Sequence, residues 1–319
     1  MLENAIVFAL TANKEMANDI VGHLGMKLGN CVVRHFADGE IMINTTDSVR
    51  GKKVYIIQST SNPVTERLME LLIFIDALKR ASAKEITAVV PYYGYARQDR
   101  KASPREPITA KLVANLLQTA GINRIVTIDL HAPQIQGFFD VPVDELSAIP
   151  FFAKYLKDKL GNKEEYVVVA PDHGGTTRAR RLSLLLDCPI AIVDKRRPRP
   201  NVAEVMGIVG DVKGKVAIMV DDIIDTGGTI IAGANKVMEN GAKKVYAVCT
   251  HGIFSEDALS KLEKSVFEEI IISNTIALPE KAASKKIKVI SLAPMIAKAI
   301  EHIEQGLSLS IVYDQFNKP

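Results

Sequence analysis

Residues 216–229 read Val-Ala-Ile-Met-Val-Asp-Asp-Ile-Ile-Asp-Thr-Gly-Gly-Thr, and this stretch decides the fold class of the chain. An apolar strand runs directly into two acids, Asp221 and Asp222, and then into a short hydroxyl-and-glycine loop that opens a helix. Such a loop offers backbone N–H groups and the positive end of a helix dipole to a phosphate. The acids repel phosphate and suit sugar hydroxyls or a metal-bound group. The stretch therefore predicts a ligand such as a sugar phosphate.

Short apolar strands alternate with helical patterns along nearly the whole chain. Because the strands read as continuous apolar runs, they fit parallel sheets that are covered on both faces. The alternation predicts an α/β fold with doubly wound parallel sheets. The predicted strands are Val54–Gln58, Ile86–Val90, Arg124–Asp129, Tyr166–Ala170, Ile190–Val193, Val216–Val220, Val245–Cys249, Glu269–Ser273 and Lys288–Leu292.

Capping residues mark several predicted helix ends. The pair Asn62-Pro63 predicts the N-cap and the first position of a helix that continues to Arg80. Glycine ends a helix readily because it adopts the left-handed conformation. The helices closed in this way are predicted to run from Thr109 to Gly121 and from Gly228 to Gly241.

The length of 319 residues predicts two domains, since single cores stop growing near ~250–300 residues. A predicted linker near Ser147–Pro150 separates an N-terminal domain, residues 1–147, from a C-terminal domain, residues 148–294. Both are predicted to be related doubly wound α/β domains. The segment 295–319 is expected to form a helix and a short strand, Leu307–Tyr313, that pack back on the first domain.

Composition places the chain among ordinary globular proteins. Apolar residues make up 47% and charged residues 24% of the chain, and the net charge is +3, so no nucleic-acid partner is implied. Cys31, Cys188 and Cys249 lack zinc or Cys-x-x-Cys spacing, which predicts buried structural thiols in a reducing cytoplasm. No apolar run approaches the ~18 residues of a membrane span, and the N-terminus lacks the basic start of a signal peptide.

Polar residues follow several predicted strands, where ligands of α/β sheets bind. His131 comes after the strand that ends at Asp129, and Asp172 after the strand that ends at Ala170. Together they suit a magnesium ion that is completed by water and phosphate oxygens. The alternative is a capping aspartate and a hydrogen-bonded histidine. The neighbouring His173 is expected to be a loop residue that points elsewhere.

The run Lys195–Arg199 holds four cations, and the prolines at 198 and 200, within and directly after it, argue against a helix or central strand. Such a run is usually a solvated loop, and a nucleic-acid patch is a second interpretation. The third, which the charge density favours, is a mobile flap that closes over phosphates.

Two further segments contain candidate nucleotide contacts. Residues 91–101 place tyrosines beside arginines, which can stack a base and hold phosphates, although subunit interfaces use the same residue types. Phe36–Glu40 is weaker, because Asp-Gly is a common turn and its acids can be solvated. The chain has no Walker loop, no Gly-x-Gly-x-x-Gly fingerprint and no protein-kinase signature, so a nucleotide would need another kind of site.

The stretch 216–229 resembles the ribose 5-phosphate or phosphoribosyl-diphosphate loop of type I phosphoribosyltransferase folds. Five other segments narrow the resemblance to the ribose-phosphate diphosphokinase family, the PRPP synthetases, of class I bacterial type. The resemblance covers nearly the full length of the chain. The segments are Phe36–Glu40, Pro91–Lys101, Asp129–Gln136, Pro171–Arg180 and Asp194–Asn201.

The resemblance implies transfer of the β,γ-diphosphoryl group of ATP to the C1 hydroxyl of ribose 5-phosphate. The products would be PRPP and AMP, for nucleotide biosynthesis. It implies ATP contacts from Asp38, Gly39, Glu40, Arg97 and Gln98, and magnesium held by His131 and Asp172. It assigns catalysis to Lys195 and Arg197, and ribose 5-phosphate binding to Arg197, Asp221, Asp222, Asp225, Thr226, Gly227, Gly228 and Thr229.

The resemblance also implies a homo-oligomer, a hexamer, that ADP inhibits at an inter-subunit site which accepts phosphate. Segments similar to that site contain Ser82, Arg105, Ser308 and Ser310. Two departures from the family pattern concern local loop shape. Leu10-Thr11 stands where the family usually has Gly-Asn, and Gly252 stands where proline is common.

Three alternatives stay open at this point. A phosphoribosyltransferase that consumes PRPP would share the stretch 216–229 but would lack the clusters at Arg97, His131 and Lys195. A non-catalytic regulatory homologue would be expected to have lost flap or phosphate-loop residues, which are present here. A nucleic-acid-binding module would rest on Lys195–Arg199 alone, against a nearly neutral net charge.

Overall fold

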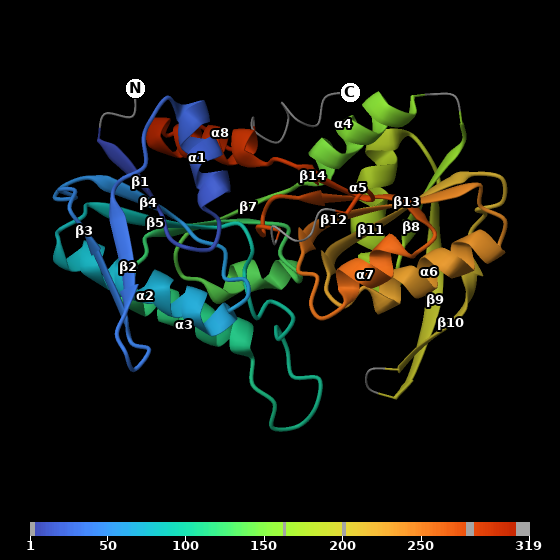
Figure 1. Ribbon diagram of the computed structural model, residues 1–319, viewed down its shortest axis with the longest axis horizontal. Coiled ribbons are helices and arrows are strands. Elements are labelled where there is room, and N and C mark those ends of the chain that lie inside the picture. The colour runs from blue at the N-terminus through green and yellow to red at the C-terminus, as the bar shows by residue number, and fades with distance from the viewer. Residues whose placement is uncertain (1–3, 162–163, 200–201, 279–283, 311–319) are drawn as a thin grey trace. The chain divides into compact units, whose positions relative to one another are not determined.

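A computed structural model describes residues 4–161, 164–199, 202–278 and 284–310, with only the backbone of residues 195–199 and 202–206. The chain forms two compact units (Figure 1). The described residues of the first unit fall within Met1–Ser147, Thr275–Ala277 and Ser291–Tyr313. Those of the second fall within Ala148–Asn274 and Leu278–Ile290.

The first unit contains a five-stranded sheet among its described residues. Neighbouring strands are parallel throughout, so their carboxyl ends lie at one edge. The three central strands are buried and mainly apolar after their first residues, as expected for a sheet covered on both faces. Their order is β1 (Ala5–Ala9), β4 (Lys53–Ile57), β5 (Glu85–Val90), β6 (Arg124–Ile128) and β7 (Val143–Leu146).

Helices cover both faces of this sheet (Figure 1). On one face lie α2 (Val64–Arg80) and α3 (Thr109–Ala120), and on the other α1 (Lys14–Leu24) packs against α8 (Ala293–Gln305). The rings of Phe8 and Phe74 meet edge to face at 5.1 Å in the core beneath α2, and both are fully buried. Burial of one such side chain stabilises a fold by about 1.5–3 kcal/mol.

A hairpin, β2 (Cys31–His35) and β3 (Ile41–Thr45), packs against α2. Ile43 is buried in the core of the first unit, and Cys31, Val33 and Ile41 pack against that core. The turn at residues 36–40 is exposed and contains Gly39 at φ +94°. The Asp-Gly pair therefore makes a turn, as the sequence predicts.

The second unit contains a seven-stranded sheet among its described residues, parallel apart from the antiparallel pair β9–β10. On one face lie α4 (Ile149–Leu160) and α5 (Thr176–Leu186), and on the other α6 (Gly228–Glu239) and α7 (Ala258–Glu263) (Figure 1). The strand order is β10 (Val202–Val209), β9 (Ile190–Arg199), β8 (Tyr166–Ala170), β11 (Val216–Ile224), β12 (Lys244–Gly252), β13 (Phe267–Ser273) and β14 (Ile287–Ile290).

The order of strands reverses between β8 and β11. From β8 the chain adds β9 and β10 on one side, and then returns to place β11 on the other. In open α/β sheets, ligands bind at the carboxyl ends of the strands where this reversal occurs. Asp172 lies in the loop after β8 and Asp221 in the last part of β11, so the topology itself marks this edge of the sheet as a candidate site.

The predicted fold class is confirmed, and each of the nine predicted strands corresponds to an observed one, but five strands were missed. Of these, β1, β7 and β10 lie at sheet edges, and β2 and β3 form the hairpin. Residues 307–310, predicted to begin a strand, do not form one, and residues 311–313 lie outside the described part. The prolines did not stop β9 at Val193, because its outer half pairs only with β10 and Pro198 falls at an irregularity of that pairing.

Several predicted boundaries need correction. Pro63, with ψ 107°, is extended and precedes the helix, so α2 begins at Val64. Asn240 is the C-cap of α6, and Gly241 follows it with φ +89°. The predicted linker is a direct junction, since Ser147 is buried and α4 starts at Ile149.

The three cysteines are free thiols, but only Cys249 is buried, whereas Cys31 and Cys188 are half-buried. Burial raises the pKa of the Cys31 and Cys188 thiols to about 11, so both stay protonated at neutral pH. Among the helices that the structure describes, none has the length and apolar character needed to cross a membrane.

Candidate active site

Two acids and one arginine lie together at the carboxyl end of β11. Asp222 is buried, with 4% of its surface exposed, and Asp221 is half-buried. From α5, Arg178 places Nη1 3.3 Å from Asp222 Oδ1 and 3.6 Å from Asp221 Oδ1. The backbone N–H of Asp222 also donates to Asp221 Oδ1 at 2.9 Å. The acids are thus held side by side by one guanidinium.

The two neighbouring carboxylates are electrostatically unfavourable to each other. Burial raises the pKa of Asp221 well above its ordinary value, the neighbouring Asp222 carboxylate raises it further, and Arg178 acts in the opposite direction. Carboxylates whose pKa values are perturbed in this way are typical of functional sites. Such acids accept hydrogen bonds from hydroxyl groups and are unsuited to a phosphate.

The loop after these acids leads into the N-terminus of α6. Gly227 adopts φ +76°, a left-handed conformation that favours glycine, and the Ile231 N–H closes the first helical turn on Gly227 O at 3.1 Å. Among the described residues, no heavy atom beyond its chain neighbours and its helix's own backbone would lie within 4 Å of a Cβ at Gly228. First-turn N–H groups lack intrahelical acceptors, so this end of α6 can bind an anion.

Asp172 follows β8 and caps a short 3-10 helix, His173–Gly175. Its Oδ1 accepts the Gly175 N–H at 3.1 Å, so the capping role considered from the sequence is the observed one. His173 is exposed, and its Nε2 lies 3.4 Å from Asp194 Oδ1. His173 is therefore paired on the surface, as expected for a loop residue.

His131 follows β6 and is exposed. Just before it, Asp129 turns the chain with φ +39° and accepts the Ser147 hydroxyl at 2.8 Å. His131 belongs to the first unit and Asp172 to the second, so their joint role as metal ligands stays a prediction. Within the described residues, no group of three or more His, Cys, Asp or Glu side chains could hold a metal ion.

The segment after β5 exposes Arg97 and Gln98 but buries Tyr92 and Tyr93. The Tyr93 hydroxyl donates to Ala110 O at 2.9 Å, so it is a structural group. The expectation that these tyrosines stack a base is therefore wrong for both, because the chain folds back against the core at Gly94. A Cβ there would lie 2.4 Å from Thr60 O, which requires glycine.

The hairpin turn presents Asp38, Gly39 and Glu40 to solvent. The Glu40 N–H donates to Asp38 Oδ1 at 3.1 Å, which holds the turn in shape. Phe36, at the start of the turn, is 55% exposed. The sequence interpretation did not include Phe36 among the site residues, although an exposed aromatic ring can stack on a flat base.

The predicted flap residues Lys195 and Arg197 lie in β9, in the part that pairs with β10 alone. The flap is thus an antiparallel ribbon that extends beyond β8. The side chains of both residues lie outside the described part of the chain.

The residues of the predicted regulatory site lie in the first unit. Arg50 Nη1 donates to Ser82 Oγ at 3.1 Å, and Ser308 Oγ lies 2.7 Å from Ser310 Oγ. Arg105 is exposed with φ +70°. The contact between Arg50 and Ser82 could not be predicted from the sequence, because it joins two loops that are far apart in the chain.

Both departures from the family pattern are accommodated locally. A Cβ at Gly252 would lie 2.6 Å from the Phe254 ring, so the phenylalanine occupies the space that a proline would need. Leu10 is fully buried in the core of the first unit, and the Thr11 hydroxyl is bonded to Glu70.

Comparisons with known proteins identify the family of the chain. Residues 5–121 match the N-terminal domain of ribose phosphate pyrophosphokinase, and residues 161–314 match the phosphoribosyl synthetase-associated domain. The chain is 58% identical to the ribose-phosphate pyrophosphokinase of Bacillus caldolyticus, over 97% of both chains. It is 55% identical to that of Bacillus subtilis, over 98% of both chains.

A solved structure supports the same relationship. The phosphoribosylpyrophosphate synthetase from Mycobacterium smegmatis superimposes with a TM-score of 0.90 and 42% identity, over 95% of this chain and 99% of that one. At this identity and coverage both the fold and the family are established. The chain belongs to the ribose-phosphate pyrophosphokinase family.

Proposed function

We propose that this protein transfers the diphosphoryl group of ATP to the C1 hydroxyl of ribose 5-phosphate, giving PRPP and AMP for nucleotide biosynthesis. One observation carries the proposal: the acids Asp221 and Asp222, held by Arg178, lead directly into the glycine loop that opens α6. This places hydroxyl acceptors beside an anion site on one continuous segment. A ribose bearing a 5-phosphate has the matching groups.

The second unit then binds the acceptor substrate. Asp221 and Asp222 accept hydrogen bonds from the ribose hydroxyls, and the loop from Asp225 to Thr229 holds the 5-phosphate. Backbone N–H groups and the dipole of α6 supply the attraction, without a lysine in the loop. The glycines, Gly227 and Gly228, let the phosphate approach the backbone closely.

The first unit binds the donor nucleotide. Arg97 and Gln98 are exposed at the carboxyl end of β5, where Arg97 can pair with phosphate oxygens. Asp38, Gly39 and Glu40 contact the nucleotide from the hairpin turn, and the exposed Phe36 ring offers a flat apolar face to the base.

Mg²⁺ is the proposed cofactor, and the available donors fit it. Mg²⁺ keeps several waters and usually takes one or two protein ligands together with substrate phosphates. His131 is exposed, and Asp172 accepts the capping Gly175 N–H through Oδ1; these two residues would hold the ion. When bound, the ion neutralises phosphate charge. Lys195 and Arg197 on the β9–β10 ribbon would stabilise the charge of the transferred group and help to exclude water.

Assembly and regulation are proposed from the family resemblance. The protein is proposed to be a cytoplasmic homo-hexamer that ADP and phosphate regulate. Ser82, Arg105, Ser308 and Ser310 are the proposed contacts for these regulators. The Arg50–Ser82 hydrogen bond supports this choice, because it places a cation beside one of the serines.

The direct test is AMP release from ATP, ribose 5-phosphate and Mg²⁺ by the purified chain alone. Lys195→Ala should lower kcat by about 10²–10³-fold, the usual effect of removing one transition-state charge contact. Lys154→Ala, which removes an exposed surface cation on α4, is the matched control. Release of diphosphate from PRPP and a base without AMP would instead identify a phosphoribosyltransferase. Absence of both activities would favour a regulatory subunit.

A further inference from the structure

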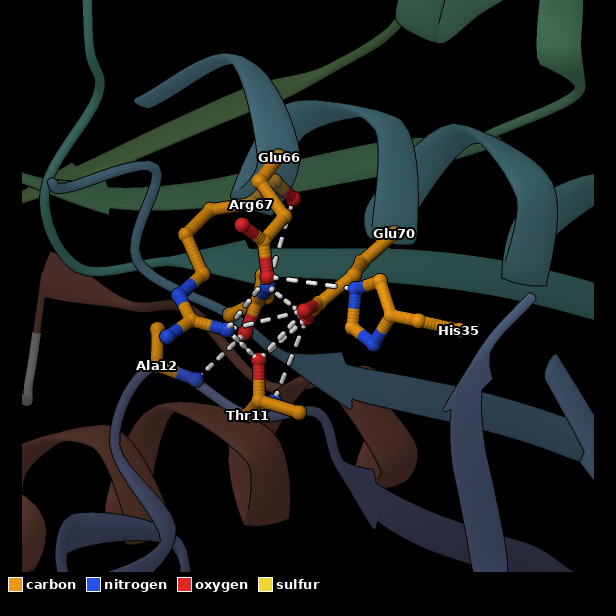
Figure 2. Close-up of polar contacts among 7 residues, drawn as sticks. Thr11, Ala12, His35, Glu66, Arg67 and Glu70 are labelled. Carbon is orange, nitrogen blue, oxygen red and sulfur yellow. Dashed lines mark hydrogen bonds and ion pairs between the residues drawn. The ribbon is translucent and has the colours of Figure 1, made fainter. Parts of the chain in front are cut away.

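A buried carboxylate organises the ligand edge of the first unit (Figure 2). Glu70 on α2 is 0% exposed, and its Oε1 lies 2.8 Å from Arg67 Nη1. The Thr11 hydroxyl donates to Oε1 at 2.6 Å, and Gln58 Nε2 donates to Oε2 at 2.8 Å. A buried charge with this many partners fixes the geometry of the groups around it.

These contacts join segments that are distant in the sequence. Thr11 follows β1, Gln58 follows β4, and Glu70 lies in the second turn of α2. The Ala12 N–H donates to Gln58 Oε1 at 3.1 Å, which closes the network between the two strand ends (Figure 2). The start of α2 is therefore held rigidly against the carboxyl edge of the sheet.

The network continues from α2 to the hairpin. Glu66 Oε1 lies 3.9 Å from Arg67 Nη1 and 3.3 Å from His35 Nε2 (Figure 2). His35 is the last residue of β2, directly before the turn at residues 36–40. The apolar contacts of the hairpin come from Val33, Ile43 and Ile41, the last of which pairs with His35 across the hairpin. The His35–Glu66 pair is thus a polar contact that ties the base of the turn to α2.

We propose that His35 and Glu66 are positioning residues that orient the turn at residues 36–40 for the nucleotide. The inference rests on the proposed function, which assigns Asp38, Gly39 and Glu40 to ATP. Neither His35 nor Glu66 touches the substrate in this account. Loss of the pair lets the turn sample other orientations, which weakens nucleotide binding. The acceptor site lies in the other unit and should not respond.

The test compares KM for ATP, KM for ribose 5-phosphate and kcat in His35→Ala, Glu66→Ala and the double variant. Each single change should raise KM for ATP by about two- to five-fold, as expected for a partly exposed polar contact. The double variant should raise it no further, because the two residues act through one contact. Asp76→Ala removes the exposed Asp76–Arg80 pair on the same helix and is the matched control. His35→Lys keeps a nitrogen donor within reach of Glu66 and should retain the wild-type KM.

Additive effects in the double variant, or equal KM values for ATP in Glu66→Ala and Asp76→Ala, would overturn the inference. So would a change spread equally over both KM values and kcat, which would indicate a structural role. Wild-type protein that releases no AMP would instead refute the proposed function. The two failures are therefore distinguishable.

Discussion

Arg178 Nη1 lies 3.3 Å from Asp222 Oδ1 and 3.6 Å from Asp221 Oδ1, so a single guanidinium compensates both acids at the end of β11. The arginine comes from α5, and the acids come from the strand beside β8. Because β8 and β11 are neighbours where the strand order reverses, α5, which follows β8, lies close enough to β11 for Arg178 to reach both acids. A carboxylate has about four acceptor sites on its two oxygens, so a guanidinium contact does not prevent it from also accepting a hydroxyl.

Arg178→Gln should move the acid limb of the pH–activity profile to higher pH. Burial and Asp222 already raise the pKa of Asp221, and Arg178 lowers it, so removal of the guanidinium raises it further. Protonated Asp221 is a poorer acceptor for a hydroxyl. The measurement is kcat/KM for ribose 5-phosphate against pH, and an unchanged acid limb would contradict the assignment. KM for ATP, measured in parallel, should change little.

Asp221→Asn should stabilise the fold while it impairs ribose 5-phosphate binding. Because the folded-state pKa of Asp221 is raised, the folded protein binds this proton more tightly than the unfolded chain does. Its contribution to stability is therefore lost as pH rises from the ordinary value of about 3.9 through the raised one. At neutral pH the charged carboxylate lowers the free energy of unfolding, and the neutral amide of asparagine avoids this loss.

Thermal unfolding of the wild type and Asp221→Asn at neutral pH and at about pH 4 shows whether removal of the buried charge causes the gain in stability. A gain of about 1 kcal/mol corresponds to a rise of roughly 2–4 °C for a chain of this size class. The gain should shrink at the lower pH, where the acid is protonated. A gain of equal size at both pH values would show that charge burial is not its source.

Gly228→Leu should block phosphate binding without unfolding the loop. A side chain at this position meets open space on the protein side, so steric conflict arises only with the ligand. KM for ribose 5-phosphate should rise by more than about ten-fold, which corresponds to about 1.4 kcal/mol. Gly22→Leu on α1 is the control, because Gly22 is also a helical glycine with open space around its Cβ position. Equal kinetics in the two variants would exclude the end of α6 as the phosphate site.

Sequence reasoning succeeded where the evidence is local. The strand, the acids and the glycine loop at residues 216–229 are contiguous, so their order alone predicted β11 and the start of α6. It could not find Arg178 as the partner of Asp222, because that contact depends on α5 packing beside β11. Burial of Tyr92 and Tyr93 was missed for the same reason: tyrosine suits both a core and a binding surface.

Three of the five missed strands have weak patterns. Only part of β7 is buried, and the hairpin strands β2 and β3 are half-exposed, so none reads as a continuous apolar run. The hydrogen-bond network around Glu70 also could not be predicted from the sequence. Thr11, Gln58 and Glu70 are ordinary polar residues in the sequence, and only the packing of α2 on the strand ends joins them.

Arg67→Met should destabilise the first unit strongly, because it leaves the fully buried Glu70 carboxylate without its cation. Breaking a buried pair from one side costs about 3–5 kcal/mol, whereas replacing both partners by apolar residues is often much less harmful. The double variant Arg67→Met/Glu70→Met should therefore unfold at a higher denaturant concentration than Arg67→Met alone. Thr11→Val, which removes only a hydroxyl donor, should lower stability by about 1–2 kcal/mol. Urea unfolding at constant m-value measures all three variants. A double variant less stable than the single one would mean that the polar network, and not its charge balance alone, is what holds α2 against the strand ends.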